Sequence, residues 1–143
     1  MLREITKIGL AVVQDGCLLL VRKRGSNCYI LPGGKPEDGE DDVIALEREI
    51  GEELGCAVDL RSLAYIGTFR DRAAGISDAE IVVKLYAGTL IGEPAPRSEI
   101  EHIIWFDPRS GRAVELAPSL TNSIVPHIFC LGATKRGSFQ AHP

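Results

Sequence analysis

The chain has 143 residues, a size typical of one domain, with 45% hydrophobic and 25% charged residues. These proportions exclude an intrinsically disordered or a fibrous protein. Sixteen basic residues against twenty acidic ones give a net charge of -4, which argues against a protein that coats DNA or RNA but leaves a small nucleotide-type ligand open. We expect one domain over residues 1–133 and a flexible C-terminal tail over residues 134–143.

The N-terminal residues, the apolar segments and the cysteines indicate where in the cell the protein is located. Charges at residues 1–7 stand where a signal peptide would begin its apolar run. No apolar segment approaches the roughly 20 residues that cross a bilayer. The four cysteines include no C-x-x-C pair. We therefore expect a cytoplasmic protein with free thiols and no membrane partner. Its oligomeric state is open, with a homodimer as one option.

The first half of the chain predicts strands followed by one helix. Apolar runs at 8–13 and 17–21, separated by Asp-Gly, predict a hairpin. A short strand-like piece at 29–31 leads into a Pro-Gly-Gly loop. Residues 41–54 follow a helical period, for which Asp41 is the expected N-cap and Gly55 the expected C-cap. The expected apolar face of this helix consists of Val43, Leu46, Ile50 and Leu54.

The second half returns to strand-like patterns. They cover residues 58–69, 79–90 and 102–106, and residues 71–78 between the first two predict a hairpin loop. A last apolar stretch at 120–131 predicts a second helix, which Pro126 should end or kink. Three strands, a helix, three strands and a helix indicate an α/β protein with a mixed sheet and helices packed against it.

The first predicted helix carries an unusual concentration of acid. Glu49, Glu52 and Glu53 fall within an arc of about 100° beside the apolar face, where they repel one another. Hard oxygen ligands in this number suit Mg²⁺, with Mn²⁺ as the alternative. A solvated acidic face is the other interpretation. Two features favour a ligand site: the carboxylates border the apolar stripe, and a Gly-Gly loop ending in Lys35, a point charge for phosphate oxygens, precedes them.

The same segment matches a longer pattern. Gly34, five residues, Glu40, seven residues and then Arg-Glu-Ile-Gly-Glu-Glu-Leu-Gly-Cys at 48–56 resemble the complete Nudix box, G-x5-E-x7-R-E-U-x-E-E-x-G-U, in which U is a bulky apolar residue. All seven fixed letters are present. Cys56 occupies the second apolar position and is smaller than usual, which a buried position should tolerate. The box covers 23 residues, and its flanks extend the resemblance to most of the chain.

This resemblance implies an α/β/α sandwich around a central mixed β-sheet, and hydrolysis of a nucleoside diphosphate linked to another group. It implies that Arg48 holds a carboxylate of the cluster in place and that Glu40 braces the loop against the helix. The metal ligands it implies are Glu49, Glu52, Glu53 and the carbonyl of Gly33. Divalent ions neutralise phosphate oxygens and acidify the attacking water, and a carboxylate then accepts the proton.

We assign the proton-accepting role to Glu52, so that the expected catalytic set is Glu52, Arg48, Lys35 and Glu99. Glu99 enters this set because it lies several residues before Trp105, as does a Glu that precedes the last strand in the Nudix family. An exposed loop acid is the alternative interpretation of Glu99. In this family the base also comes from outside the box, so both candidates stay open.

Two further residues are candidates for substrate binding. Tyr29 stands just before the Leu-Pro-Gly-Gly loop, where an aromatic ring can pack beside a substrate. Asn122 resembles the Asn that reads the base in MutT-type triphosphatases, since an amide pairs with a purine edge in both directions. The alternative for Asn122 is a helix N-cap.

The expected function is Mg²⁺-dependent hydrolysis of a pyrophosphate linkage in a small nucleotide-type substrate, with no nucleic acid polymer as partner. A nucleoside triphosphate, such as one with a modified base, is the first expectation. ADP-ribose, dinucleotides and nucleotide sugars present the same diphosphate and stay open. A nucleotide-binding or regulatory module of the same fold that does not hydrolyse is a different class of function, which the intact set of glutamates disfavours.

Overall fold

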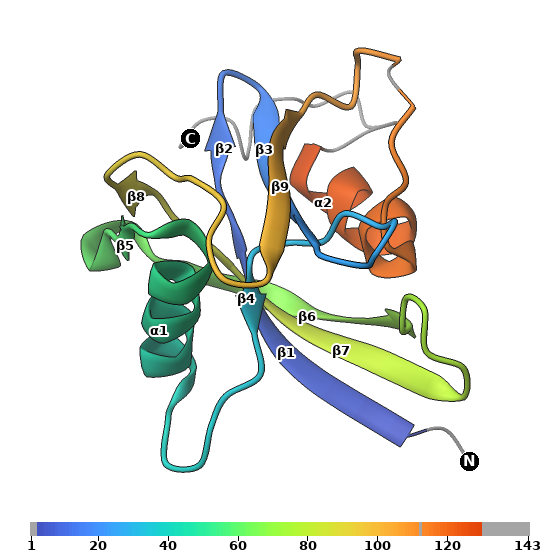
Figure 1. The fold of residues 1–143 in the computed structure, drawn as a ribbon, viewed down its shortest axis with the longest axis horizontal. Helices are drawn as coiled ribbons and strands as arrows, with labels where there is room; N and C mark the ends of the chain where they lie inside the picture. The colour runs from blue at the N-terminus through green and yellow to red at the C-terminus, as the bar shows by residue number, and fades with distance from the viewer. Residues whose placement is uncertain (1–2, 112, 130–143) are drawn as a thin grey trace.

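The computed structural model describes residues 3–111 and 113–129, which form strands flanked by helices (Figure 1). The strands are β1 (Arg3–Ala11), β2 (Val13–Gln14), β3 (Cys17–Lys23), β4 (Gly33–Gly34), β5 (Ala57–Val58), β6 (Ala64–Arg72), β7 (Ala79–Ala87), β8 (Leu90–Ile91) and β9 (Ile100–Phe106). The helical elements are α1 (Asp42–Leu54), the 3₁₀-helix η1 (Leu60–Ser62), the π-helix η2 (Leu120–Ile124) and α2 (Val125–Phe129).

The main sheet is mixed. Its strand order is β4-β1-β7-β6, in which β1 and β7 run parallel while β4 and β6 pair antiparallel with their neighbours. A second sheet has the order β2-β3-β9 with antiparallel pairing, and β5 pairs with β8. The loop between β6 and β7 is the predicted hairpin connection. None of the helices in the described ranges has the length and apolar character that a bilayer crossing requires.

Strand β3 separates two hydrophobic cores, because successive side chains of a strand point to opposite faces. Leu19 and Val21 pack with the buried face of α1, whereas Leu18 and Leu20 pack with η2 and α2. Figure 1 accordingly shows α1 and α2 on opposite sides of the strands. The expected α/β fold with a central mixed sheet between helices is confirmed.

The boundaries of α1 follow its capping residues. Asp41 Oδ1 accepts a hydrogen bond from the amide of Ile44 at 2.9 Å. At the other end, Gly55 adopts a left-handed backbone with φ of 71°, and its amide donates to the carbonyl of Gly51. A residue with a side chain pays a steric penalty for that conformation, so glycine suits this position. Both predicted caps of this helix are confirmed.

Several element boundaries differ from the sequence prediction. β1 begins at Arg3 rather than at residue 8, because its parallel pairing with β7 extends through the polar residues to Arg3 and Ala79. Residues 29–31 form only isolated bridges, which involve Tyr29 and Ile30. The predicted strand at 58–69 is interrupted by η1, whose first turn is capped by the side chain of Asp59.

The C-terminal helix passes through Pro126 rather than ending there. Before the proline, the amide of Val125 donates to the carbonyl of Leu120, five residues earlier. This π-type bonding shifts the hydrogen-bond register immediately before a residue that has no amide proton to donate. The predicted end of the helix at 131 and the predicted tail at 134–143 lie outside the described residues.

Candidate active site

The glycine pair of β4 lies directly against the acidic face of α1. The amide of Gly33 donates to Glu53 Oε1 at 3.0 Å. A Cβ on Gly34 would collide with the carboxylate of Glu49, and a Cβ on Gly33 would collide with the carbonyl of Ile8 on β1. Gly33 also has a φ of 137°, which disfavours residues with side chains. Both positions therefore require glycine for the loop and the helix to approach so closely.

Arg48 connects the loop to the helix. Its guanidinium donates to both oxygens of Glu40, at 2.7 and 2.9 Å, and to Glu49 Oε2 at 3.1 Å. It also donates to the carbonyl of Lys35 at 3.1 Å and lies 3.4 Å from Glu52 Oε1. Glu40 in turn accepts from the loop amide of Glu37 at 2.7 Å. Arg48 and Glu40 thus hold the loop and the carboxylate cluster in one arrangement.

Burial makes the cluster electrostatically unfavourable. Glu53 is only 2% exposed, and its burial raises its pKa to about 8, against the opposing effect of the Gly33 hydrogen bond. Burial also raises the pKa of Glu49, although the hydrogen bond and charge of Arg48 oppose this change. Arg48 lowers the pKa of Glu40. A nearby cation would stabilise the charged form of both carboxylates with raised pKa values, the buried Glu53 and the half-buried Glu49.

The donor chemistry of the cluster fits a hard divalent cation. Carboxylate oxygens from Glu49, Glu52 and Glu53 are ligands that Mg²⁺ and Mn²⁺ accept. In the described part of the chain, no three Asp, Glu, His or Cys side chains are arranged as a coordination shell. Arg48 holds Glu49 and contacts Glu52, while Gly33 holds Glu53. Coordination would therefore require these side chains to turn toward the ion.

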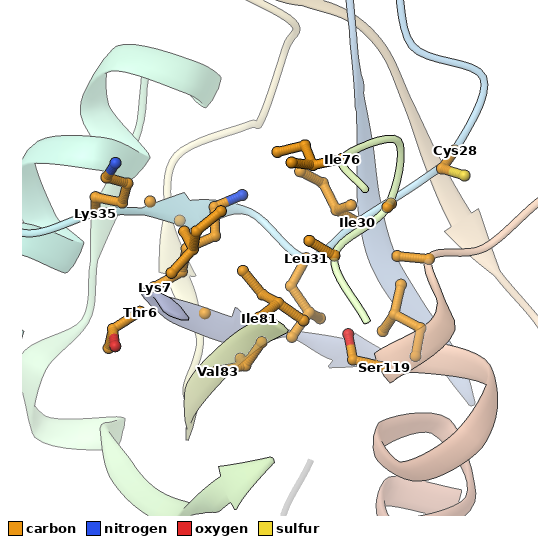
Figure 2. A pocket seen from close by; sticks show the side chains of 18 of the residues that line it. Thr6, Lys7, Cys28, Ile30, Leu31, Lys35, Ile76, Ile81, Val83 and Ser119 are labelled. Atoms are coloured by element: carbon orange, nitrogen blue, oxygen red, sulfur yellow. The ribbon is translucent and has the colours of Figure 1, made fainter. Parts of the chain in front are cut away.

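A cavity of about 630 Å³ opens beside β4. Figure 2 shows Lys7 and Lys35 at one end of this cavity and Leu31 and Ser119 toward the other, with Ile81 and Val83 between them. Ile30, Leu120 and Ile124 add to its apolar wall. Arg3, Glu4 and Arg72 are further charged residues of the lining. Cationic side chains beside an apolar wall match a ligand that carries both phosphate and a less polar group.

Sequence reasoning missed several residues that line the cavity, among them two lysines. Lys7 comes from β1 and Lys23 from β3, so they belong to different sheets. Lys7 lies just before the first predicted strand, and nothing in its local pattern indicates a site. Only the parallel pairing of β1 with β7, which the sequence does not encode locally, places Lys7 inside a strand beside β4.

Among the other predicted site residues, Lys35 and Gly33 line the cavity, whereas the carboxylates of Glu49, Glu52, Glu53 and Glu99 are not part of its lining. Glu99 lies at the edge of the cavity through an ion pair with Lys23 at 3.6 Å. Glu52 is the most exposed carboxylate of the box cluster, with a side chain that is 54% exposed.

The two predicted substrate-binding residues are not brought to the cavity lining. The Tyr29 ring lies under the guanidinium of Arg22, 5.8 Å from it, and its hydroxyl is 3.5 Å from His102 Nδ1. The Asn122 amide donates to Asp71 Oδ2 at 2.7 Å. Asn122 lies within η2, so the alternative interpretation of this residue as a helix N-cap is wrong.

Comparison with known proteins assigns the family. The NUDIX domain model matches residues 6–124, which include the whole box and the strands around the cavity. The chain belongs to the Nudix family. The expected resemblance is therefore confirmed by a match that extends far beyond the 23 residues of the box.

The chain is also similar to individual known proteins. A MutT-like protein from Streptomyces ambofaciens is 32% identical over 75 residues, which make up 52% of this chain and 47% of the relative, about half of its length. The MutT Nudix hydrolase from Burkholderia pseudomallei is 26% identical, with a TM-score of 0.68 over 83% of this chain and 95% of that one. An ADP-ribose pyrophosphatase from Streptococcus suis, 20% identical with a TM-score of 0.61 over 94% and 95% of the two chains, shares the fold.

Proposed function

We propose that this Nudix protein is a hydrolase that cleaves a pyrophosphate linkage in a nucleoside diphosphate derivative, with Mg²⁺ or, alternatively, Mn²⁺ as cofactor. One observation carries the proposal. Arg48 and the glycines of β4 hold a carboxylate cluster, of which Glu53 is buried, beside a cavity that has cationic side chains and an apolar wall. A binding module would have little need for three crowded carboxylates, whose mutual repulsion costs stability.

We assign roles to the carboxylates, the arginine and the lysine of the box and to the glycine before it. Glu49, Glu52, Glu53 and the carbonyl of Gly33 hold the cation. When bound, the cation supplies positive charge to the phosphate oxygens and lowers the pKa of the attacking water. Arg48 orients Glu49 through its 3.1 Å hydrogen bond, and Lys35 attracts phosphate oxygens in the cavity.

Proton transfer from the water needs a carboxylate that is accessible. Glu52 is our first candidate, because its side chain is more than half exposed and Arg48 contacts it only at 3.4 Å. Glu99 is the alternative from outside the box, and it would act from the edge of the cavity beside Lys23. The general base must come within hydrogen-bond reach of the attacking water.

We propose a nucleoside triphosphate as the first substrate, including one with a modified base. ADP-ribose, dinucleotides and nucleotide sugars are the alternatives. The MutT relatives support the first choice, and a cavity of about 630 Å³ has the usual size for a ligand of this class. To recognise the base of the substrate, Asn122 would have to break its amide hydrogen bond to Asp71. To contact the substrate, Tyr29 would have to turn from His102 toward the cavity. The cytoplasm as compartment and the lack of a nucleic acid partner also stay predictions, and the oligomeric state stays open, with a homodimer as one option.

The test is product formation from a panel of nucleoside triphosphates, oxidised guanine nucleotides, ADP-ribose, dinucleotides and nucleotide sugars, followed by chromatography. We expect turnover that depends on Mg²⁺ or Mn²⁺ and differs among panel members. Glu53→Gln is the negative control. Nucleotide binding without turnover of any panel member, with both metals supplied, would overturn the proposal in favour of a binding module.

A further inference from the structure

The side chain of Lys7 faces the cavity, and among the described residues its ammonium group forms no ion pair. Its side chain extends from β1 toward β4 (Figure 2) and is part of the lining. Among the described residues, no carboxylate oxygen lies within 4.0 Å of its ammonium group, although Glu53 and Glu49 attract it from farther away. Burial lowers the pKa of Lys7, and the charge of Lys23 lowers it further. A partly buried ammonium group without a partner is costly, and an anionic ligand would offset that cost.

Lys23 supplies a second charge to the same cavity. It comes from β3, whereas Lys7 comes from β1, and the two amines repel one another. Its ion pair with Glu99 has a distance of 3.6 Å to a side chain that is 60% exposed. Exposed pairs of this kind contribute little to stability. Lys23 therefore remains available to a ligand that enters between the two lysines.

Two neighbouring ammonium groups favour a ligand group that carries two negative charges. A terminal phosphate has a second pKa near 6 and so carries about -1.5 to -2 at pH 7. A phosphate esterified on both sides has no such second ionisation. A dianionic group matches two neighbouring lysines better than a monoanionic one, because it neutralises both and removes their repulsion.

We propose that Lys7 and Lys23 form a binding site for a terminal phosphoryl group, which makes the protein favour nucleoside di- and triphosphates over substrates whose diphosphate is esterified at both ends. The proposal rests on the proposed function and names its substrate class. In this proposal the two lysines contact the terminal phosphoryl group, while the carboxylate cluster holds the cation. The apolar wall of the cavity is then left to the nucleoside.

The first test is binding, with inorganic pyrophosphate as the probe and calorimetry at saturating Mg²⁺ as the measurement. We expect Lys7→Met and Lys23→Met each to weaken binding by about ten-fold, the loss of one charge-assisted hydrogen bond, and Lys7→Arg to retain most of it. The matched controls are Lys84→Met and Arg22→Met. Lys84 lies on β7 and pairs with Asp42, and Arg22 adjoins Lys23 but pairs with Glu101; neither lines the cavity.

The controls should bind pyrophosphate like the wild type. Unchanged binding in both lysine variants, equal losses in the controls, or no pyrophosphate binding by the wild type would overturn the proposal. Thermal melting curves identify a variant that fails to fold, and Lys7→Gln then replaces Lys7→Met.

The second test compares kcat/KM for a nucleoside triphosphate with kcat/KM for ADP-ribose. We expect the wild type to favour the triphosphate and both lysine variants to lose most of that preference. Equal losses for the two substrates would refute the terminal-phosphate site while leaving the hydrolase proposal intact. If no substrate is hydrolysed but the lysine variants still lose pyrophosphate binding, the hydrolase proposal fails and the phosphate site stands.

Discussion

The amide of Gly33 donates a hydrogen bond to the carboxylate of Glu53 across 20 residues of sequence, at 3.0 Å. Glu53 is almost completely buried, and within the described residues no lysine or arginine forms an ion pair with it. A buried carboxylate held mainly by a backbone amide is ready to exchange that bond for a stronger electrostatic partner. This bond joins the glycine loop to the helix.

Glu53→Gln should keep the fold and lose turnover. The substitution removes a charge but little volume, so the packing around the side chain should persist. We expect kcat at saturating Mg²⁺ to fall by at least about 100-fold, because a ligand contributes more than the outer partners of a metal site. Glu47→Gln, on the exposed side of the same helix, is the control and should stay active. Near-normal turnover in Glu53→Gln would contradict a ligand role.

The contribution of Glu53 to the stability of the metal-free protein should fall as pH rises from about 4.5 to about 8. Over this interval folded Glu53, with its pKa raised to about 8 by burial, still binds a proton that the unfolded chain has released. The folded state therefore binds more protons, and raising the pH favours unfolding. Urea titrations across this range should show a smaller decrease for Glu53→Gln than for the wild type. Parallel pH profiles for the two proteins would contradict the raised pKa.

Arg48→Lys should weaken metal dependence more than substrate binding. A lysine cannot donate to both oxygens of Glu40 while also holding Glu49 and the loop carbonyl, as the guanidinium does. We expect a higher Mg²⁺ concentration for half-maximal activity, a small change in KM, and a loss of about 1–2 kcal/mol in stability. Arg109→Lys, which alters an exposed pair with Asp107, serves as the control. Unchanged Mg²⁺ dependence would reject the orienting role.

Gly34→Ala should impair the site without changing any charge. The φ of Gly34 is not in the left-handed region, so the backbone accepts alanine, but the added Cβ would meet the Glu49 carboxylate. We expect Glu49 to be displaced and the Mg²⁺ requirement to rise. Gly51→Ala is the matched control, because an added Cβ there meets no other atom within 4 Å. In that variant helix propensity should raise stability by up to about 1 kcal/mol. Equal Mg²⁺ requirements in both variants would contradict the displacement of Glu49 by the added Cβ.

Local sequence information was sufficient for the helix and for much of the carboxylate cluster. A capping residue, a helical period and a glycine in the C-cap position act within a few residues, so the bounds of α1 followed from the sequence. The spacing of the glutamates likewise placed them on one helix face. Arg48 and Glu40 belong to the same contiguous box, and their contact follows from the fold of that segment.

Long-range pairing decided the remaining features of the site. The parallel alignment of β1 with β7 extended β1 to Arg3 and brought Lys7 to the cavity, while Lys23 arrived from a different sheet. The bond between Asn122 and Asp71 joins residues 51 positions apart, and it directs the Asn122 amide to a carboxylate instead of the cavity. Sequence periodicity reports which face of an element is buried, whereas the partner of each strand depends on contacts summed over the whole chain. The sequence by itself therefore determined the acidic helix and indicated the family of the protein. Only the tertiary structure decided which cationic side chains face the cavity.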